Sequence, residues 1–191
     1  MNSKTSRTFF QNRFAIAKKQ GGFSTVELSL ALLIVALIVV AAVVWYVDNL
    51  RKNSINANTN EMISVAATAK KKYGQINQYA NVTTAIAVTG QVIPTWLRDG
   101  VAATATNSFG GAITVAPATL TGADDALNVA WPNVPRNQCS DIVIGVNNSA
   151  RRIQVGGVDV KATDAAINIA TVEAQCDAAD VTTINMFVGR N

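Results

Sequence analysis

A single carboxylate, Glu27, lies at the amino end of the most apolar stretch of the sequence. From Leu28 to Val47 there are 20 residues, and Ser29 is the only polar one. A helix of this length spans about 30 Å, the thickness of the hydrocarbon core of a bilayer. A carboxylate in such a segment is unfavourable by several kcal/mol unless it is paired. Glu27 is therefore a candidate functional residue that requires a cationic partner.

The glycines before this segment suggest where that partner comes from. A secretory signal carries small residues after a shorter apolar core, whereas Gly21 and Gly22 precede the apolar run. Cleavage after Gly22 would leave the membrane helix in place with a free amine at Phe23. That ammonium, on an adjacent copy of the chain, could pair with Glu27 and would fix the axial register of the two helices.

A local role for Glu27 remains open beside this one. Ser24-Thr25-Val26-Glu27 fits the S-x-x-E capping box, in which the glutamate bonds back to an exposed backbone amide. The two roles are compatible, with capping in the free subunit and pairing in an assembly.

The charge distribution argues against a nucleic-acid groove. Lys and Arg total 16 and Asp and Glu total 12, but residues 1–22 hold five of the bases and none of the acids. The rest of the chain is therefore near neutral, and phosphate neutralisation needs clustered bases. We expect the basic amino end on the cytoplasmic side of a membrane and the carboxyl-terminal part outside.

The sequence lacks the residues on which most active sites depend. It has no histidine, the commonest general base and a frequent metal ligand. It has no G-x-x-x-x-G-K-[ST] loop, and its acidic pairs lack the alternating spacing of calcium loops. We therefore expect no catalytic residue, no cofactor and no metal site.

Two cysteines remain as candidate covalent chemistry. Cys139 and Cys176 are the only ones, and neither belongs to a C-x-x-C motif of the kind that binds zinc or performs redox catalysis. In an exported domain such a pair favours one disulfide, with two buried free thiols as the alternative.

The segment K-K-Q-G-G-F-S-T-V-E-L-S-L, which starts at Lys18, resembles the prepilin signal of type IV pilins. In that family a membrane peptidase cuts after the glycine and methylates the new amino terminus. The resemblance implies that Gly22 precedes the cut and that Phe23 is the methylated first residue. It also implies that Glu27, fifth in the mature chain, pairs with the amino terminus of a neighbouring subunit.

The rest of the chain resembles the type IVb branch, known from toxin-coregulated, bundle-forming and conjugative thin pili. The long leader, the large head and the carboxyl-terminal cysteine pair carry this likeness, and G-G-A-I-T-V and V-P-R-N-Q-C-S-D-I are similar to PilS-type thin-pilus pilins. Phe23 departs from the pattern, because phenylalanine in first position is more typical of the type IVa branch. The implied fold is α+β, a type IV pilin fold in which a long helix, transmembrane in its amino half, packs on an antiparallel β-sheet head.

The spacing of apolar residues predicts the helices and strands that position these residues. Apolar residues spaced as one helical face predict that the helix runs from Ser24 to near Gln78, with a bend or local melting in the asparagine-rich segment 53–60. Lys70 to Lys72 should form a solvated face, with contact to acids of a neighbouring subunit as the alternative. Residues 81–130 predict a long irregular connection with short strands. A short helix is predicted at 139–146, and strands are predicted at 112–115 and 127–131 before it and at 152–155 and 182–188 after it.

These expectations define three parts and one function. Residues 1–22 form a cleaved basic leader, 23–52 a transmembrane and filament-core helix, and 53–191 a head that includes the second half of the long helix and the disulfide region. The predicted function is the major subunit of a type IVb pilus, for adhesion, aggregation or conjugative mating-pair contact. Its partners would be other copies of itself, the prepilin peptidase, the assembly machinery, the inner membrane before assembly, and a host or recipient cell surface.

Other classes of protein share parts of this pattern. A minor pilin or a type II secretion pseudopilin carries the same signal, and an uncleaved membrane-anchored binding module would retain residues 1–22. We expect the subunit in the inner membrane with its head in the periplasm before assembly, and in an extracellular filament afterwards.

Overall fold

A computed structural model describes residues 24–74, 79–100 and 103–190 of the chain. Its first element is a 49-residue helix, α1, from Thr25 to Tyr73. The Ser24 hydroxyl accepts a hydrogen bond from the Glu27 amide (3.4 Å), and the Ser24 carbonyl accepts one from the Leu28 amide (3.0 Å). The helix therefore begins where the capping motif predicts. It ends at Tyr73, a few residues earlier than expected.

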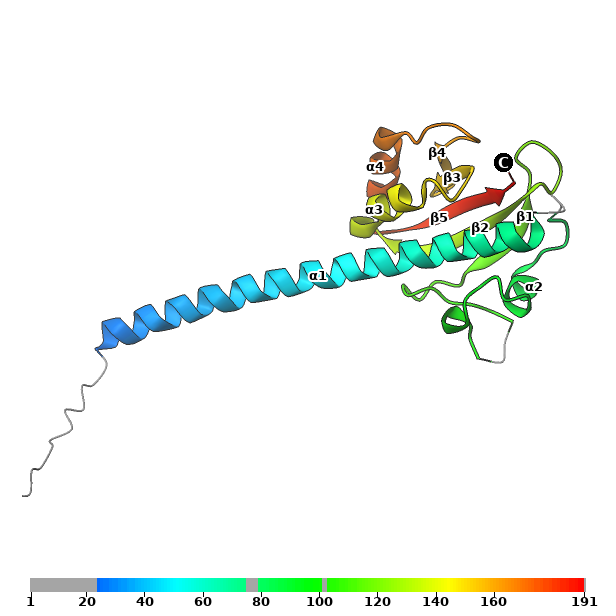
Figure 1. Ribbon diagram of the computed structural model, residues 1–191. Coiled ribbons are helices and arrows are strands. Elements are labelled where there is room, and N and C mark those ends of the chain that lie inside the picture. The colour runs from blue at the N-terminus through cyan, green and yellow to red at the C-terminus, as the bar shows by residue number, and fades with distance from the viewer. Residues whose placement is uncertain (1–23, 75–78, 101–102, 191) are drawn as a thin grey trace, which may run out of the picture. The chain divides into compact units, whose positions relative to one another are not determined.

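The chain divides into two compact units between Val44 and Trp45. The described part of the first unit is the apolar first half of α1. The second unit holds the remainder of α1 and every other element, and it is the folded head described below (Figure 1).

The head contains a five-stranded sheet with the order β1-β2-β5-β3-β4, in which every neighbouring pair is antiparallel. The strands are β1 (Thr114–Ala118), β2 (Ala126–Pro135), β3 (Arg152–Val155), β4 (Val158–Lys161) and β5 (Val181–Gly189). All four predicted strands have counterparts here: the bounds of 152–155 coincide with those of β3, the other three have shifted ends, and β4 was not predicted. It pairs with β3 across a turn at Gly156 and Gly157, both of which have positive φ.

The two faces of the sheet differ in polarity. On one face the cross-strand pairs are Leu127 with Val188, Val129 with Met186, and Trp131 with Ile184, and all six residues are buried. The alternate positions include the pair Ala130 and Asn185, which points to the opposite, more polar face. The first face is consequently the floor of the hydrophobic core.

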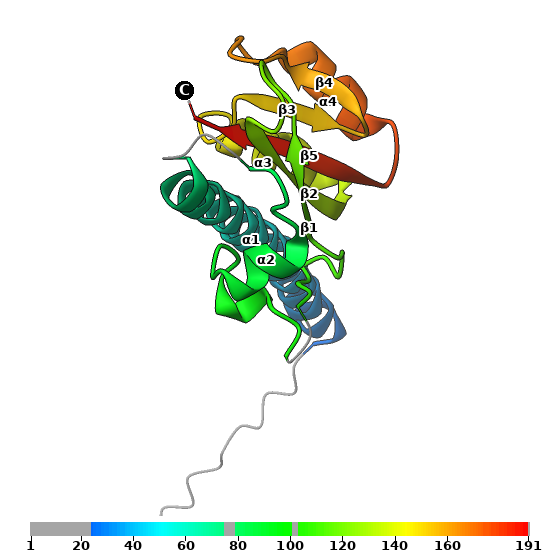
Figure 2. The ribbon, with the colours of Figure 1, turned by 90° about the vertical axis from the view of Figure 1, so that its right-hand side faces the viewer.

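Two helices cover this floor (Figures 1 and 2). The second half of α1 contributes Met62, Val65, Ala66 and Ala69, all buried in the core. Helix α3 (Arg136–Val146) buries four residues on one face, as the spacing predicted: Cys139, Ile142, Val143 and Val146.

Helices α1 and α3 approach each other closely at Gly145. A Cβ atom built on Gly145 would lie 2.7 Å from Cγ2 of Thr59, closer than side chains pack. Arg51 of α1 and Asp141 of α3 form an exposed ion pair of 3.1 Å along the same contact. A glycine at 145 therefore permits the close contact between the two helices.

The asparagine-rich segment of α1 corrects one expectation. We predicted a bend or local melting at 53–60, but the helix runs through this segment without interruption. Asn58 is fully buried, where its side-chain amide donates to the Ser54 carbonyl (2.9 Å) and its Oδ1 accepts from the Trp131 indole (3.1 Å). These tertiary contacts outweigh the weak helix propensity of asparagine.

The connection after α1 is more regular than predicted. It contains the short helix α2 (Thr84–Thr89) and the 3-10 turn η1 (Thr95–Leu97). The Thr84 hydroxyl accepts a hydrogen bond from the Val115 amide (2.9 Å) and so protects the free edge of β1. Figure 2 shows α2 close to β1 and α1.

A fourth helix, α4 (Ile169–Asp177), was not predicted. It contacts β3, β4 and α3, and it contains Cys176. Asn168 caps it by accepting a hydrogen bond from the Thr171 amide (3.2 Å). Cys139 belongs to α3 and Cys176 to α4, so the two cysteines lie on a pair of helices that contact each other.

Candidate functional site

The amino end of α1 carries one of the two sets of predicted site residues. Gly22 and Phe23 lie outside the described residues, and so does the basic leader 1–22. Glu27 occupies the first turn of the helix, and its side chain is exposed. Among the described residues, the structure shows one half of the predicted cap, in which the Ser24 hydroxyl accepts a hydrogen bond from the Glu27 backbone N–H. Within the described residues, the Glu27 carboxylate forms no hydrogen bond or ion pair.

The apolar half of α1 exposes large side chains around its whole circumference. Val26, Leu37, Val44 and Trp45 retain between 63% and 73% of their accessible surface. Among the described residues, α1 is the one helix that is long and apolar enough to cross a membrane. Soluble proteins rarely expose a continuous surface of this kind, so lipid or other helices must cover it.

The second set of predicted site residues lies in the head. Cys139 and Cys176 form a disulfide with their Cα atoms 5.6 Å apart, which confirms the predicted bond and excludes the free thiols. Two polar contacts join the same helices, Ser140 Oγ to Glu173 Oε1 (2.5 Å) and Arg136 Nε to Asp177 Oδ1 (2.6 Å). Helices α3 and α4 are thus held together by one covalent bond and two polar contacts.

The head exposes a large aromatic side chain that no sequence motif had marked. Trp96 in η1 retains 71% of its surface, and its indole donates to Glu61 Oε1 (3.3 Å). Burial raises the pKa of Glu61, an effect that the hydrogen bonds from Trp96 and Ser108 only partly offset. Neither residue belongs to a sequence motif, and their proximity depends on how η1 lies on α1.

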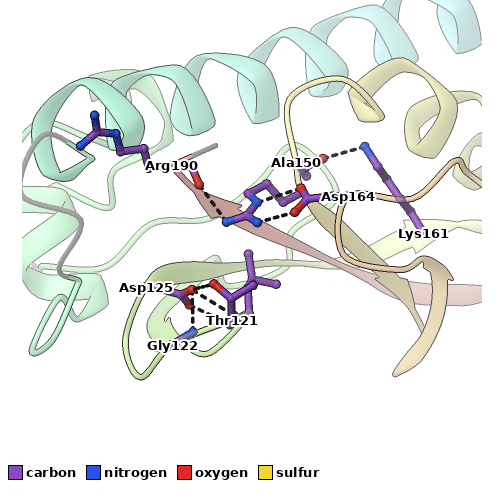
Figure 3. Close-up of polar contacts among 9 residues, drawn as sticks. Thr121, Gly122, Asp125, Ala150, Lys161, Asp164 and Arg190 are labelled. Carbon is purple, nitrogen blue, oxygen red and sulfur yellow. Dashed lines mark hydrogen bonds and ion pairs between the residues drawn. The ribbon is translucent and has the colours of Figure 1, made fainter.

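Charged groups gather where the ends of β3, β4 and β5 meet the end of α1. The Arg151 guanidinium binds both carboxylate oxygens of Asp164, with Nε 2.8 Å from Oδ1, and also donates to the Arg190 carbonyl (2.8 Å). The Lys161 ammonium donates to the Asn147 carbonyl (2.6 Å) and the Ala150 carbonyl (2.8 Å). Figure 3 shows Lys161 reaching Ala150 beside Asp164.

The nearby Asp125 organises the loop between β1 and β2 (Figure 3). Its oxygens accept hydrogen bonds from the amides of Leu120 (2.7 Å), Thr121 (2.9 Å) and Gly122 (2.9 Å), and from the Thr121 hydroxyl (2.6 Å). Burial alone would raise the pKa of Asp125, but these hydrogen bonds outweigh it and hold the pKa well below its ordinary range. The carboxylate is therefore a structural anchor.

The three lysines at the end of α1 differ from one another. Lys71 and Lys72 are exposed, as predicted, and Lys72 donates to the Gly90 carbonyl. Lys70 is half-buried, and burial together with the charge of Arg151 lowers its pKa. The prediction of a solvated face is thus wrong for Lys70.

Within the described ranges, no group of three or more His, Cys, Asp or Glu residues is arranged to hold a metal ion.

The sequence of the head matches a known protein family. A family model described as "PilS N terminal" matches residues 52–188, which is most of the chain and nearly all of the head. Among curated proteins, no sequence matches the chain.

Two solved structures share the fold. One is TcpA, a type IV pilin from Vibrio cholerae El Tor, with a TM-score of 0.54 at 15% identity over 71% of this chain and 98% of that one. The other is a type IVb pilin from Salmonella typhi, with a TM-score of 0.51 at 21% identity over 69% of this chain and 99% of that one. The fold of a long helix and an antiparallel sheet described above is therefore one that type IV pilins also have.

Proposed function

Because the chain belongs to the PilS family and is a type IVb pilin, we propose that it is the major subunit of an extracellular type IVb pilus. Its role is structural and adhesive, without catalysis. The observation that carries the proposal is the exposed apolar surface of α1 with a single acid, Glu27, at its amino end.

Membrane storage and polymerisation both follow from that surface. Before assembly, lipid covers residues 26–47 and the head lies in the periplasm. In the filament, equivalent helices of other copies replace the lipid. Lipid tails are as apolar as the neighbouring helices, so this exchange gains little from the hydrophobic effect. A specific polar contact is needed to favour assembly and to set its geometry.

Glu27 supplies that contact. The prepilin peptidase removes residues 1–22 by cutting after Gly22, and the new amine at Phe23 is methylated. A methylated amine remains a cation, and in an apolar surrounding its attraction to a carboxylate is far stronger than in water. Only one axial offset between neighbouring helices brings Phe23 of one copy to Glu27 of the next. The pair therefore fixes the rise from subunit to subunit.

The head forms the outer surface of the filament in this proposal. It meets a host or recipient cell in adhesion, aggregation or mating-pair contact. The disulfide between Cys139 and Cys176 holds α3 and α4 together in this exposed location, where oxidising conditions preserve it.

The proposal is tested on filaments sheared from native cells. Intact-mass measurement should give a chain that begins at Phe23, carries one added methyl group and has an oxidised cysteine pair. A chain found only in membranes and beginning at Met1 would refute the pilus assignment and support an anchored binding module. Abundance in the sheared fraction distinguishes a major from a minor subunit.

A pair of variants tests the role of Glu27. Glu27→Ala should leave membrane insertion intact and strongly reduce the yield of filaments. Asp48→Ala is the matched control, because Asp48 is an acid of the same helix that pairs locally with Lys52 (2.6 Å). It should assemble normally. Equal filament yields from the two variants would show that Glu27 does not set the register.

A further inference from the structure

A polar pocket of about 230 Å³ opens on the head where α1 ends beside β3 and β4. Four charged side chains line it: Lys70, Arg151, Lys161 and Asp164. The proposed pilus function uses none of them. The other described residues of the lining are Asn148, Ala150 and Ala165.

Three of the four charged groups are held in place by the fold. Arg151 retains only 12% of its side-chain surface and is fixed by Asp164 and the Arg190 carbonyl. Two carbonyl groups orient the Lys161 ammonium, which has three N–H donors. One donor of Lys161 is therefore left over after its two backbone contacts. The pocket is preorganised, which lowers the entropic cost of binding.

The positive charge in the pocket is only partly compensated. Among the described residues, three cations line it against one carboxylate, and both oxygens of that carboxylate are bound by Arg151. Asp125 is close enough to influence Arg151, but its own oxygens accept four hydrogen bonds within the β1–β2 loop. Within the described residues, no carboxylate lies within ion-pair distance of Lys70 or Lys161.

The two lysines are consequently unfavourable as cations where they stand. Burial lowers the pKa of both, Arg151 adds to the effect on Lys70, and Lys70 adds to the effect on Lys161, against an opposing effect of Asp164. A bound anion would relieve this repulsion, and partial burial makes the attraction stronger than at the surface.

We propose that this pocket is an oxyanion-binding site in which the ammonium groups of Lys70 and Lys161 hold a phosphate or carboxylate group. Arg151 is a positioning residue, because its guanidinium is already bound to both oxygens of Asp164 and only its positive charge acts on the ligand. The ligand is either a phosphoryl group or the carboxylate of an acidic sugar, since both present oxygens to a pair of point-like cations.

The test measures the rate of reductive methylation of each lysine in the whole mature chain, which begins at Phe23, in an uncharged detergent. Reductive methylation followed by peptide mass spectrometry gives a rate for every lysine. Inorganic phosphate and glucuronate are the probes, and sodium chloride at equal ionic strength is the blank. At a probe concentration of about ten times Kd, Lys70 and Lys161 should react about tenfold more slowly. Lys71 and Lys72, on the same turn of α1, should be unaffected.

The two probes separate the two sources of the ligand. Protection by phosphate alone supports a phosphoryl ligand, protection by glucuronate alone supports an acidic sugar, and protection by both supports a general oxyanion site. No protection by either probe, or equal slowing of Lys71 and Lys72, would overturn the proposal.

A variant pair checks that the two lysines act together. Lys70→Gln should abolish the protection of Lys161, whereas Lys71→Gln should preserve it. Unchanged protection of Lys161 in Lys70→Gln would contradict the shared site. These readouts are independent of filament assembly, so the site can fail without affecting the proposed function, and the reverse also holds.

Discussion

The buried contact between Asn58 and Trp131 offers the sharpest test of how α1 is held to the head. Both residues are fully buried, and Asn58 Oδ1 accepts the indole N–H at 3.1 Å across 73 positions of sequence. Asn58→Leu keeps a side chain of similar size but removes this acceptor. It also removes the donor to the Ser54 carbonyl.

The expected destabilisation follows from opposing contributions. A buried indole N–H without a partner costs about 1–3 kcal/mol. The higher helix propensity of leucine returns up to about 0.7 kcal/mol, and its apolar surface returns a further part. We therefore expect Asn58→Leu to lower the free energy of unfolding by about 1–2 kcal/mol at neutral pH.

Urea unfolding of the mature chain in detergent, followed by far-ultraviolet circular dichroism, measures this change. Asn56→Leu is the matched control, because Asn56 is exposed two positions away on the same helix. There only the propensity gain applies, so its stability should rise by a few tenths of a kcal/mol. In a Trp131→Phe background, Asn58→Leu should be nearly neutral or stabilising, because no orphaned donor remains.

Two results would refute this reasoning. If the Asn58→Leu and Asn56→Leu variants had the same free energy of unfolding, the hydrogen bond to the indole would contribute nothing to stability. An equal cost of Asn58→Leu in the wild-type chain and in the Trp131→Phe background would place the effect in the helix and not in the contact.

Two further predictions concern the head. Asp125→Asn should lower the free energy of unfolding by about 1–3 kcal/mol at pH 7, because an amide cannot accept all four hydrogen bonds of the carboxylate. The pKa of Asp125 is depressed in the folded state, so its contribution is complete above about pH 4, the ordinary range for the unfolded chain, and declines as the pH falls below it. Urea midpoints of wild type and variant should converge in acid, and a gap that is constant with pH would contradict this. Replacing Cys139 and Cys176 together by alanine should cost about 4 kcal/mol, from the entropy of a loop closed over 37 positions. A loss under about 1 kcal/mol in the same unfolding assay would show that other contacts already restrict that loop.

The sequence by itself determined the features that depend on local order along the chain. Hydropathy identified the membrane-length segment, because a helix that must face lipid on all sides needs an unbroken apolar run. The S-x-x-E motif placed the start of α1 at the correct residue, and a 3.6-residue period identified α3 with its buried face. The position of Glu27 within this run was sufficient to mark it as a candidate for pairing.

The tertiary structure alone decided which distant groups meet. Asparagine has a weak helix propensity, so the sequence predicted a bend near Asn58, whereas its hydrogen bond with Trp131 of β2 holds the helix in place. Helix α4 is short, and its stability comes largely from contacts with α3 and the β3–β4 pair, so its own sequence signal is weak. Lys70 lies on α1, Lys161 on β4 and Arg151 just before β3, and only the packing of α1 on the sheet brings their charges into one pocket. Periodicity reports the environment of a residue, but the identity of its partner depends on the fold of the whole head.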